Sequence, residues 1–141
     1  MAVSYEGMKK ISVKTMVNDG GREGEAKAPN GSLAVRTSMA DTPGTTTPEQ
    51  LFAAGYASCF NGAMSFPTEA DGKGDLKRTV RADVELFNGP GATDFKLKVQ
   101  LIGHIDGLSA AETLKYMEAA HQICPYSKAT VGNIEVELSA E

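Results

Sequence analysis

The chain has 141 residues, of which 41% are hydrophobic, and this length supports one domain over residues 1–141 that folds without disulfide staples. Its formal net charge is −4 and its Lys and Arg residues are scattered, so it lacks the basic patch of a nucleic-acid-binding protein. No stretch reaches the roughly 18 apolar residues of a membrane span, and the N-terminus lacks the apolar core of a signal peptide, so we expect a cytoplasmic protein.

The N-terminal part of the chain predicts a meander of three strands. Apolar and polar residues alternate over residues 11–17, which is the period-two pattern of a half-buried strand. An Asn-Asp-Gly-Gly sequence at residues 18–21 predicts a hairpin turn, and Pro-Asn-Gly at residues 29–31 predicts another turn. We therefore expect two further strands, over residues 22–28 and 32–37.

A helix is predicted next, with Thr47 as its N-cap. Pro48 fits the first helical position, and Gln50 occupies the position of a capping box that favours Glu or Gln. Apolar side chains then recur at helical spacing and predict an inward face. The members of this stripe are Phe52, Tyr56, Cys59, Ala63 and Phe66.

Alternation in the second half of the chain predicts three more strands. They cover residues 80–86, 95–101 and 134–138. Ser109 and Glu112 form the capping box of a second helix, and Pro125 limits its end because the residue before a proline avoids the α region. The predicted order is β-β-β-α-β-β-α-β, which belongs to the α+β class.

The two cysteines of the chain, Cys59 and Cys124, are candidates for redox chemistry. Cytoplasmic thiols are kept reduced, so such a pair is more often catalytic, redox-active or metal-binding than a structural disulfide. Cys59 lies in the apolar stripe, where a thiol is often a plain core residue and is inert without a nearby cation. The arginines that could supply the cation are Arg22, Arg36, Arg78 and Arg81, with Arg22 set apart by its glycine-rich turn.

Cys124 is expected at the carboxyl end of the second helix, one turn after His121. The partial negative charge of that helix end disfavours a thiolate, so Cys124 should be the weaker nucleophile. His121 leaves two alternatives open, a Cys-His catalytic pair with Cys59 and a metal site that also includes His104. The close Cys-x-x-Cys spacing typical of zinc sites is missing from the sequence, so we expect no metal.

Two segments of the chain carry a family resemblance. The sequence TPEQLFAAGYASCF at residues 47–60 and the sequence AAHQICPYSKAT at residues 119–130 resemble the two signatures of the OsmC/Ohr family. Both look like the organic hydroperoxide resistance (Ohr) branch of that family. The similarity extends over nearly the whole chain, including the Gly21-Arg22 turn, so it implies the OsmC-like fold.

The resemblance implies an intertwined homodimer that acts as a thiol-dependent peroxidase. Such enzymes reduce organic hydroperoxides, including lipid-derived ones, to alcohols, with active sites at the subunit interface. The matching motif positions imply that Cys59 is the peroxidatic cysteine, Cys124 the resolving cysteine, Arg22 the activating arginine and Glu49 its carboxylate partner. The family has no bound cofactor, and its external dithiol reductant is a lipoyl-bearing protein.

An apolar substrate surface is expected around Cys59, suited to an alkyl tail. The residues expected there are Phe52, Tyr56, Phe60, Met64 and Phe66. The alternative is that several of these side chains simply belong to the core. Residues 67–75 look shorter and more polar than the usual extension of the first helix in this family, so we expect that wall of the pocket to differ.

Two other functions remain open from the sequence. Cys59 and His121 would serve as nucleophile and base of an acyl transferase or hydrolase. The chain would also fit a non-enzymatic redox sensor or binding protein whose disulfide changes its shape. Peroxide consumption with a dithiol separates these hypotheses, because a sensor is oxidised stoichiometrically and does not turn over.

Overall fold

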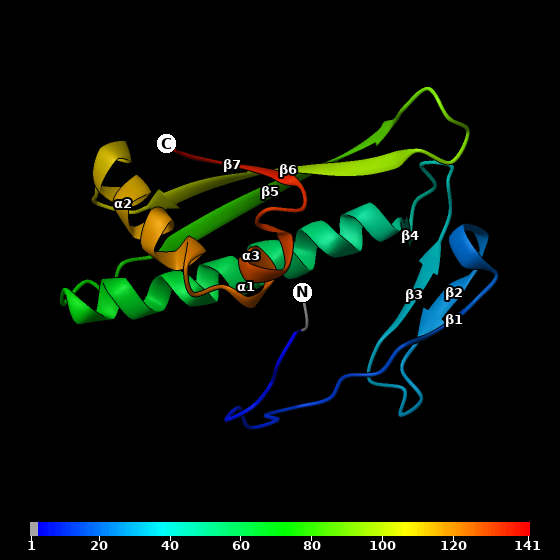
Figure 1. The fold of residues 1–141 in the computed structure, drawn as a ribbon, viewed down its shortest axis with the longest axis horizontal. Coiled ribbons are helices and arrows are strands. Elements are labelled where there is room, and N and C mark those ends of the chain that lie inside the picture. Colours follow the sequence, from blue (N-terminus) through cyan, green and yellow to red (C-terminus); the bar gives the residue numbers. More distant parts are fainter. Residues whose placement is uncertain (1–2) are drawn as a thin grey trace. The chain divides into compact units, whose positions relative to one another are not determined.

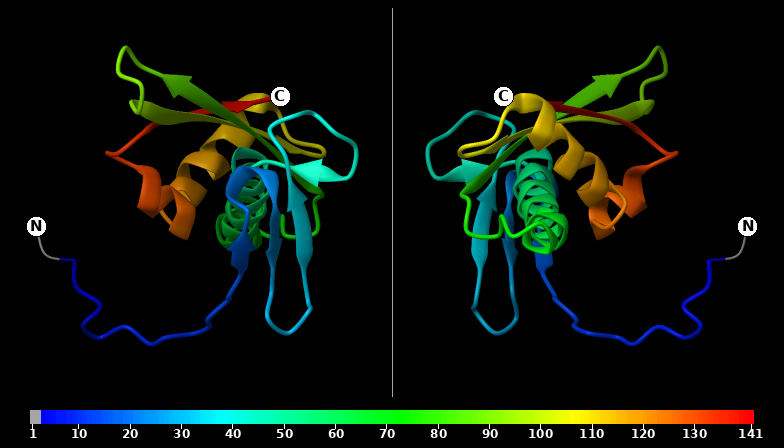
Figure 2. Two further views of the ribbon diagram at one scale, coloured as in Figure 1. Left: turned by 90° about the vertical axis from the view of Figure 1, so that its right-hand side faces the viewer. Right: turned by 90° about the vertical axis from the view of Figure 1, so that its left-hand side faces the viewer.

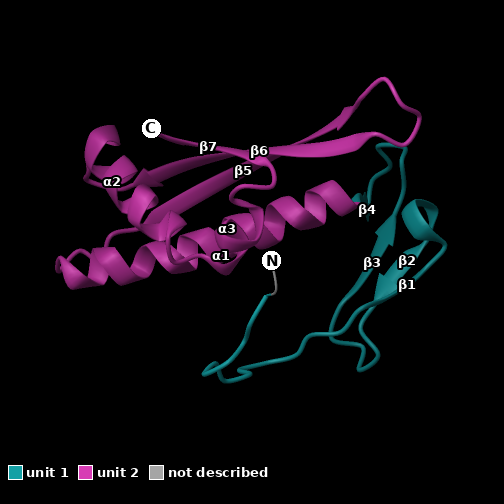
Figure 3. Cartoon of the chain, in the orientation of Figure 1, with its two compact units in different colours: residues 1–47 teal, residues 48–141 magenta. Residues whose placement is uncertain are grey.

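The structure of the protein is a computed structural model that describes residues 3–141 (Figure 1). The chain divides into two compact units, residues 1–47 and residues 48–141 (Figure 3). Arg22 belongs to the first unit, whereas Cys59 and Cys124 both belong to the second. Both thiols of the predicted pair therefore lie in one unit, whereas the predicted activating arginine belongs to the other.

The first unit holds a four-stranded sheet in the order β1-β2-β3-β4, with the first two pairings antiparallel and the last parallel. Its elements are β1 (Val17–Asp19), the 3-10 helix η1 (Gly21–Glu23), β2 (Glu25–Lys27), β3 (Ala34–Thr37) and β4 (Thr45–Thr46). The hairpin predicted at residues 18–21 is confirmed, because β1 pairs with β2 and Gly20 adopts a φ of 87°. The two following strands, β2 and β3, are shorter than predicted. In the case of β2, η1 occupies the start of the predicted strand.

The strand predicted over residues 11–17 is wrong except at its last residue. β1 begins only at Val17, and the preceding apolar side chains are exposed, with Ile11 at 93% and Val13 at 69%. A strand needs a neighbour that pairs its backbone N–H and C=O groups. No described residue of this chain pairs with residues 11–16, so their alternation has no sheet to join here.

The second unit packs two long helices against a three-stranded sheet, and a third, short helix packs against the first of them (Figure 2). Its elements are α1 (Pro48–Ala70), β5 (Arg78–Asn88), β6 (Phe95–Ile105), α2 (Ala110–His121), α3 (Pro125–Thr130) and β7 (Glu135–Ala140). β6 lies in the middle of the sheet, antiparallel to β5 and parallel to β7. The strands predicted in the second half of the chain are thereby confirmed. β6 is paired on both sides and is the central strand of this sheet.

The core of this unit forms where α1 and α2 meet β6. Alternate residues of β6 point inward, and Val99 and Leu101 are fully buried. They pack in one cluster with Phe60 of α1 and Met117 of α2. A Cβ atom at Gly103 of β6 would collide with the Met117 side chain, so the glycine lets α2 approach the sheet.

Both long helices start where the capping residues predict. α1 begins at Pro48 and continues through Pro67 to Ala70, so the first residues of the polar 67–75 segment still belong to the helix. At the start of α2, Ser109 Oγ accepts a hydrogen bond from the Glu112 N–H at 3.1 Å, and the Ser109 N–H donates to Glu112 Oε2 at 3.1 Å. The predicted capping box is therefore confirmed.

The architecture confirms the α+β prediction and adds three elements to the predicted order, of which η1 is the first. β4 is a short parallel strand, and α3 is a separate helix that begins directly after Cys124. Neither α1 nor any other helix within residues 3–141 combines the length and the apolar character that a membrane crossing needs.

Candidate active site

The two cysteine thiols lie side by side in the second unit. Cys124 Sγ is 3.3 Å from Cys59 Sγ, although 65 positions separate the two residues in the chain. Both are free thiols, and Cys124 is fully buried while Cys59 is partly exposed. A disulfide needs about 2.05 Å between the sulfurs, so an approach of about 1.2 Å would join them.

Cys124 lies at a junction between two helices rather than at the end of one. α2 ends at His121, and the Cys124 N–H still donates to Ala120 O at 2.8 Å. Cys124 then has φ −59° and ψ 122°, a conformation that suits a residue before proline, and it is the N-cap of α3, which Pro125 begins. Cys124 thus follows the carboxyl end of α2 and precedes the amino end of α3, and the two helix ends carry opposite partial charges. The position of Cys124 at the end of α2 therefore does not by itself rank the two thiols as nucleophiles. What distinguishes the thiols is access, because solvent reaches only Cys59.

Tyr126 joins α3 to α1 beside the cysteines. Its backbone N–H forms a hydrogen bond with the Cys59 thiol. Its ring centroid lies 6.3 Å from that of Phe52 and 5.9 Å from that of Tyr56, and the ring rests on Gly55. Tyr126 was not among the site residues expected from the sequence, where its place directly after Pro125 was the available signal.

The surroundings of Cys59 within the second unit favour the neutral thiol. Burial is the largest influence and raises the pKa of Cys59 above its ordinary value. The Tyr126 amide acts in the opposite direction, and the neighbouring Cys124 thiol adds to the increase in the pKa. A reactive thiolate at neutral pH therefore requires a positive charge in addition to these groups.

His121 hydrogen-bonds within a buried polar cluster. Its Nδ1 lies 2.7 Å from Ser127 Oγ, and its ring is 6.3 Å from that of Phe60. Burial lowers the pKa of His121, which favours the neutral imidazole. His121 Nδ1 is thus engaged with Ser127. Cys59 instead interacts with Cys124 and with the backbone of Tyr126.

Local bonds of the first unit build the tight turn that carries Arg22. Thr37 Oγ1 donates to Gly21 O at 2.9 Å and accepts from the Gly24 N–H at 3.0 Å. A Cβ atom at Gly24 would collide with Asp19 O, so glycine is required there. The turn holds the backbone of Arg22 in a defined place within its own unit.

Glu49 lies in the first turn of α1, in the second unit. It precedes Cys59 by ten positions, which corresponds to about 15 Å along a helix axis. A direct contact between this carboxylate and the sulfur along the helix is therefore not available.

The predicted substrate residues divide into core and surface. Tyr56, Phe60 and Met64 are fully buried, so they belong to the core of the second unit, as the alternative interpretation held. Phe52 is partly buried beside the Tyr126 ring, and Phe66 is 64% exposed. The stripe is not one continuous inward face, because α1 turns Phe66 away from the core.

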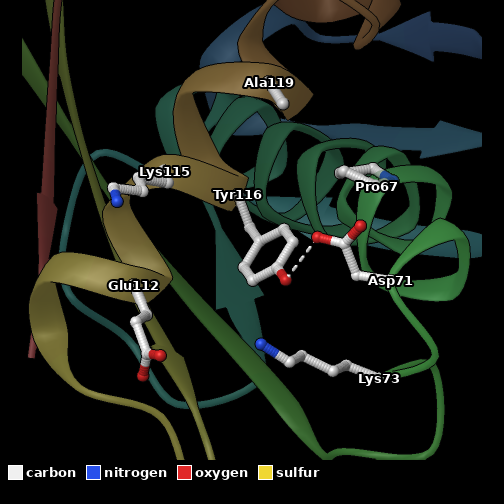
Figure 4. A pocket seen from close by; sticks show the side chains of 7 residues that line it. All are labelled: Pro67, Asp71, Lys73, Glu112, Lys115, Tyr116 and Ala119. Atoms are coloured by element: carbon white, nitrogen blue, oxygen red, sulfur yellow. Dashed lines mark hydrogen bonds between the residues drawn. The ribbon is translucent and has the colours of Figure 1, made fainter.

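A cavity of about 400 Å³ lies at the other end of α1 (Figure 4). Its lining residues are Pro67, Asp71, Lys73, Glu112, Lys115, Tyr116 and Ala119. The Tyr116 hydroxyl donates to Asp71 Oδ2 at 2.7 Å, and Lys73 Nζ lies 5.6 Å from the centre of the tyrosine ring. Neither cysteine lines this cavity, and its polar groups tie the end of α1 to α2.

His104, the second histidine considered as a metal ligand, is engaged at the end of β6. Its Nδ1 lies 2.7 Å from the backbone oxygen of Glu141, and its Nε2 lies 3.1 Å from Asp106 Oδ1. Within residues 3–141, no group of three or more His, Cys, Asp or Glu side chains is placed to hold a metal ion.

Comparison with known proteins places the sequence in one family. The family described as OsmC-like protein matches residues 41–139. The "Organic hydroperoxide resistance protein-like 2" of Staphylococcus epidermidis is 40% identical over 129 residues, which cover 88% of this chain and 91% of that protein. The "Organic hydroperoxide resistance protein-like 1" of Staphylococcus saprophyticus is 41% identical over 143 residues, covering 99% and 96% of the two chains.

Solved structures agree with this assignment. The organic hydroperoxide resistance protein OhrB of Bacillus subtilis superposes with a TM-score of 0.83 at 32% identity, covering 92% of this chain and 98% of that chain. An organic hydroperoxide resistance protein from Legionella pneumophila gives the same TM-score of 0.83 at 35% identity, covering 94% and 99%. The predicted family and fold are thereby confirmed.

Proposed function

Because this chain belongs to the OsmC-like protein family, we propose that it is a thiol-dependent peroxidase that reduces organic hydroperoxides to alcohols. The names of its relatives support the class of substrate. The observation that carries the proposal is the distance of 3.3 Å between Cys59 Sγ and Cys124 Sγ, because a peroxidase of this kind needs one accessible thiol and a second thiol within reach.

The first step is the oxidation of Cys59. The Cys59 thiolate attacks the outer peroxide oxygen, the O–O bond breaks, and the leaving alkoxide takes up a proton to become the alcohol. Cys59 becomes a sulfenic acid. Partial exposure suits Cys59 to this role, since the fully buried Cys124 cannot meet a substrate first.

The second step joins the two sulfurs. The Cys124 thiol displaces hydroxide from the Cys59 sulfenic acid, which forms the disulfide and releases water. An external dithiol then reduces the disulfide and is itself oxidised to a disulfide. A lipoyl-bearing protein is the reductant that the family resemblance implies, and the whole cycle needs no bound cofactor.

Arg22 and Glu49 complete the proposed mechanism. Because burial raises the pKa of Cys59, the thiolate needs a cation, and Arg22 would lower the thiol pKa and stabilise the charge passing to the alkoxide. Glu49 would orient the guanidinium through paired hydrogen bonds without touching the sulfur.

An intertwined homodimer and an apolar substrate surface also belong to the proposal. The alternating segment over residues 11–16 exposes its apolar side chains, and a second copy of the chain would supply a strand for it to pair with. Phe52 and Phe66 are the predicted substrate residues left with exposed surface, whereas Tyr56, Phe60 and Met64 are fully buried and belong to the core. A cytoplasmic location fits the reducing environment that this cycle requires.

The test is the consumption of cumene hydroperoxide with dihydrolipoamide as the reductant. Cys59→Ser should abolish turnover, whereas Ser58→Ala, which changes the exposed neighbour on α1, should retain it. Hydrogen peroxide should be consumed more slowly than cumene hydroperoxide, since it has no apolar part to bind. Turnover by Cys59→Ser at the wild-type rate would contradict the proposal.

The two other functions predict different results with the same protein. Hydrolysis of an ester or thioester in the absence of peroxide would support the Cys59–His121 acyl-transfer enzyme. Reduction of one equivalent of peroxide, with oxidation of the protein but no further turnover in the presence of dithiol, would support the redox sensor.

A further inference from the structure

Three buried hydroxyl groups connect α1 to α3 next to the cysteine pair. The Tyr56 hydroxyl lies 3.0 Å from Ser127 Oγ and 3.0 Å from Thr130 Oγ1. Tyr56 and Ser127 are fully buried, and Thr130 is 6% exposed. Buried hydrogen bonds of this kind fix the distance between the two helices, because breaking them leaves buried hydroxyl groups with neither a protein partner nor water to bond.

This hydroxyl cluster, formed by Tyr56, Ser127 and Thr130, is attached to both thiols through short stretches of helix. Tyr56 precedes Cys59 by three positions on α1, which is about one helical turn. Ser127 follows Cys124 by three positions and lies in the first turn of α3. Each sulfur is therefore one turn away from the bonds that join the two helices.

α3 depends on such an anchor because it is short. The helix has six residues, and isolated helices of that length are not stable in water. Its connection to Cys124 is the hydrogen bond from the Lys128 N–H to Cys124 O, at 3.0 Å. A shift of α3 would consequently move the Cys124 sulfur relative to Cys59.

We propose that Tyr56, Ser127 and Thr130 are positioning residues for disulfide formation. This inference rests on the proposed peroxidase function and adds to it. The hydroxyl cluster holds α3 against α1, so that Cys124 captures the sulfenic acid on Cys59 before a second hydroperoxide molecule does.

Two reactions compete for the Cys59 sulfenic acid. Capture by the Cys124 thiol gives the disulfide and one water molecule. Attack on a second hydroperoxide gives the sulfinic acid and one alcohol molecule, and this product is not reduced by dithiols. The hydroxyl cluster affects only the rate of disulfide formation, because it touches neither the hydroperoxide nor the Cys59 sulfur.

Tyr56→Phe is the sharpest variant because it leaves no buried polar group without a partner. Ser127 Oγ keeps its 2.7 Å contact with His121 Nδ1, and Thr130 Oγ1 still donates to Ser127 O at 3.1 Å. The control is Tyr116→Phe, which removes another tyrosine hydroxyl that bonds Asp71 at a site away from the cysteines. Ser127→Ala and Thr130→Val are second variants of the same cluster.

Mass spectrometry measures the fractions of Cys59 present as disulfide and as sulfinic acid while the concentration of cumene hydroperoxide is raised. Loss of the two hydrogen bonds of the Tyr56 hydroxyl should lower the hydroperoxide concentration that gives half sulfinic acid by at least about fivefold in Tyr56→Phe. This concentration should be unchanged in Tyr116→Phe. The rate of the first oxidation should stay at the wild-type value in both. Ser127→Ala and Thr130→Val should shift the division in the same direction, and they decide the matter if Tyr56→Phe does not fold.

Each outcome bears on one of the two proposals. A wild-type division in Tyr56→Phe and in both second variants would overturn the positioning role while leaving the peroxidase intact. Slower first oxidation with an unchanged division would also overturn it, because the cluster would then act on Cys59 itself. A wild-type protein whose Cys59 is not oxidised by hydroperoxide would overturn the peroxidase function and, with it, this inference.

Discussion

The ring of Tyr126 lies so close to Gly55 that a Cβ atom at position 55 would be 3.0 Å from the tyrosine hydroxyl oxygen. Such a distance is shorter than an ordinary van der Waals contact, so the ring would have to move. Because the Tyr126 backbone also bonds the Cys59 thiol, Gly55 helps α3 to lie close to α1 beside the cysteines.

Gly55→Ala and Gly62→Ala should therefore differ in stability. Both glycines lie inside α1, where alanine is favoured over glycine by about 1 kcal/mol. A Cβ at Gly62 meets no described heavy atom within 4 Å, so Gly62→Ala should raise the free energy of unfolding by up to about 1 kcal/mol. Gly55→Ala should show no such gain, because displacing Tyr126 offsets it. Urea unfolding measures both, and an equal gain in the two variants would contradict the proposed contact.

Cys124→Ser should separate the two chemical steps. Cys59 remains available in this variant, so one equivalent of hydroperoxide should still be reduced at close to the wild-type rate. The sulfenic acid then has no neighbouring thiol, and sulfinic acid should accumulate with excess hydroperoxide. Mass spectrometry of the Cys59 peptide distinguishes these products. A disulfide-linked dimer as the main product would show instead that Cys59 is resolved by another chain.

Arg22→Ala should raise the pKa of the Cys59 thiol. Burial already raises this pKa, and the proposed guanidinium is the group that lowers it, so its loss should leave the neutral thiol dominant at neutral pH. The titration is followed by thiolate absorbance in a Cys124→Ser background, where Cys59 is the only thiol. Arg36→Ala is the matched control, since it removes a guanidinium from the same unit. Equal Cys59 pKa values with and without Arg22 would contradict the activation mechanism.

The two histidines should affect acid stability in opposite directions. Burial lowers the pKa of His121 below its ordinary 6.5, so the unfolded chain takes up a proton there first and stability is lost as the pH falls below about 6.5. The bond to the Glu141 backbone, with Asp106, raises the pKa of His104, so its contribution is present at low pH and is lost as the pH rises through that pKa.

Urea unfolding between pH 7 and 5 tests this assignment. His121→Asn, which keeps a group able to bond Ser127, should lose less stability on acidification than the wild type. His104→Asn should lose more, because the compensating proton uptake is gone. The reverse order of the two variants would contradict the assignment.

Local sequence determined most of the elements of this protein. The capping box of Ser109 and Glu112, the Thr47-Pro48 helix start and the alternation over β5, β6 and β7 each depend on residues within a few positions of one another. Such local patterns predict structure well because the interacting groups belong to the same segment of the chain. The two motifs around Cys59 and Cys124 were likewise sufficient to identify the family.

The tertiary structure decided the features that depend on partners far away in the chain. Alternation over residues 11–16 gave no strand, because the described part of this chain offers no neighbour for it. The same helical stripe placed Tyr56 in the core and Phe66 at the surface, since only the packing of α1 decides which turn is covered. Cys124 proved to be the N-cap of a separate helix, and this junction brings its sulfur to 3.3 Å from Cys59 across 65 positions. Periodicity along one element fixes which residues share a face, but the distance between two elements is set by the side chains that pack between them.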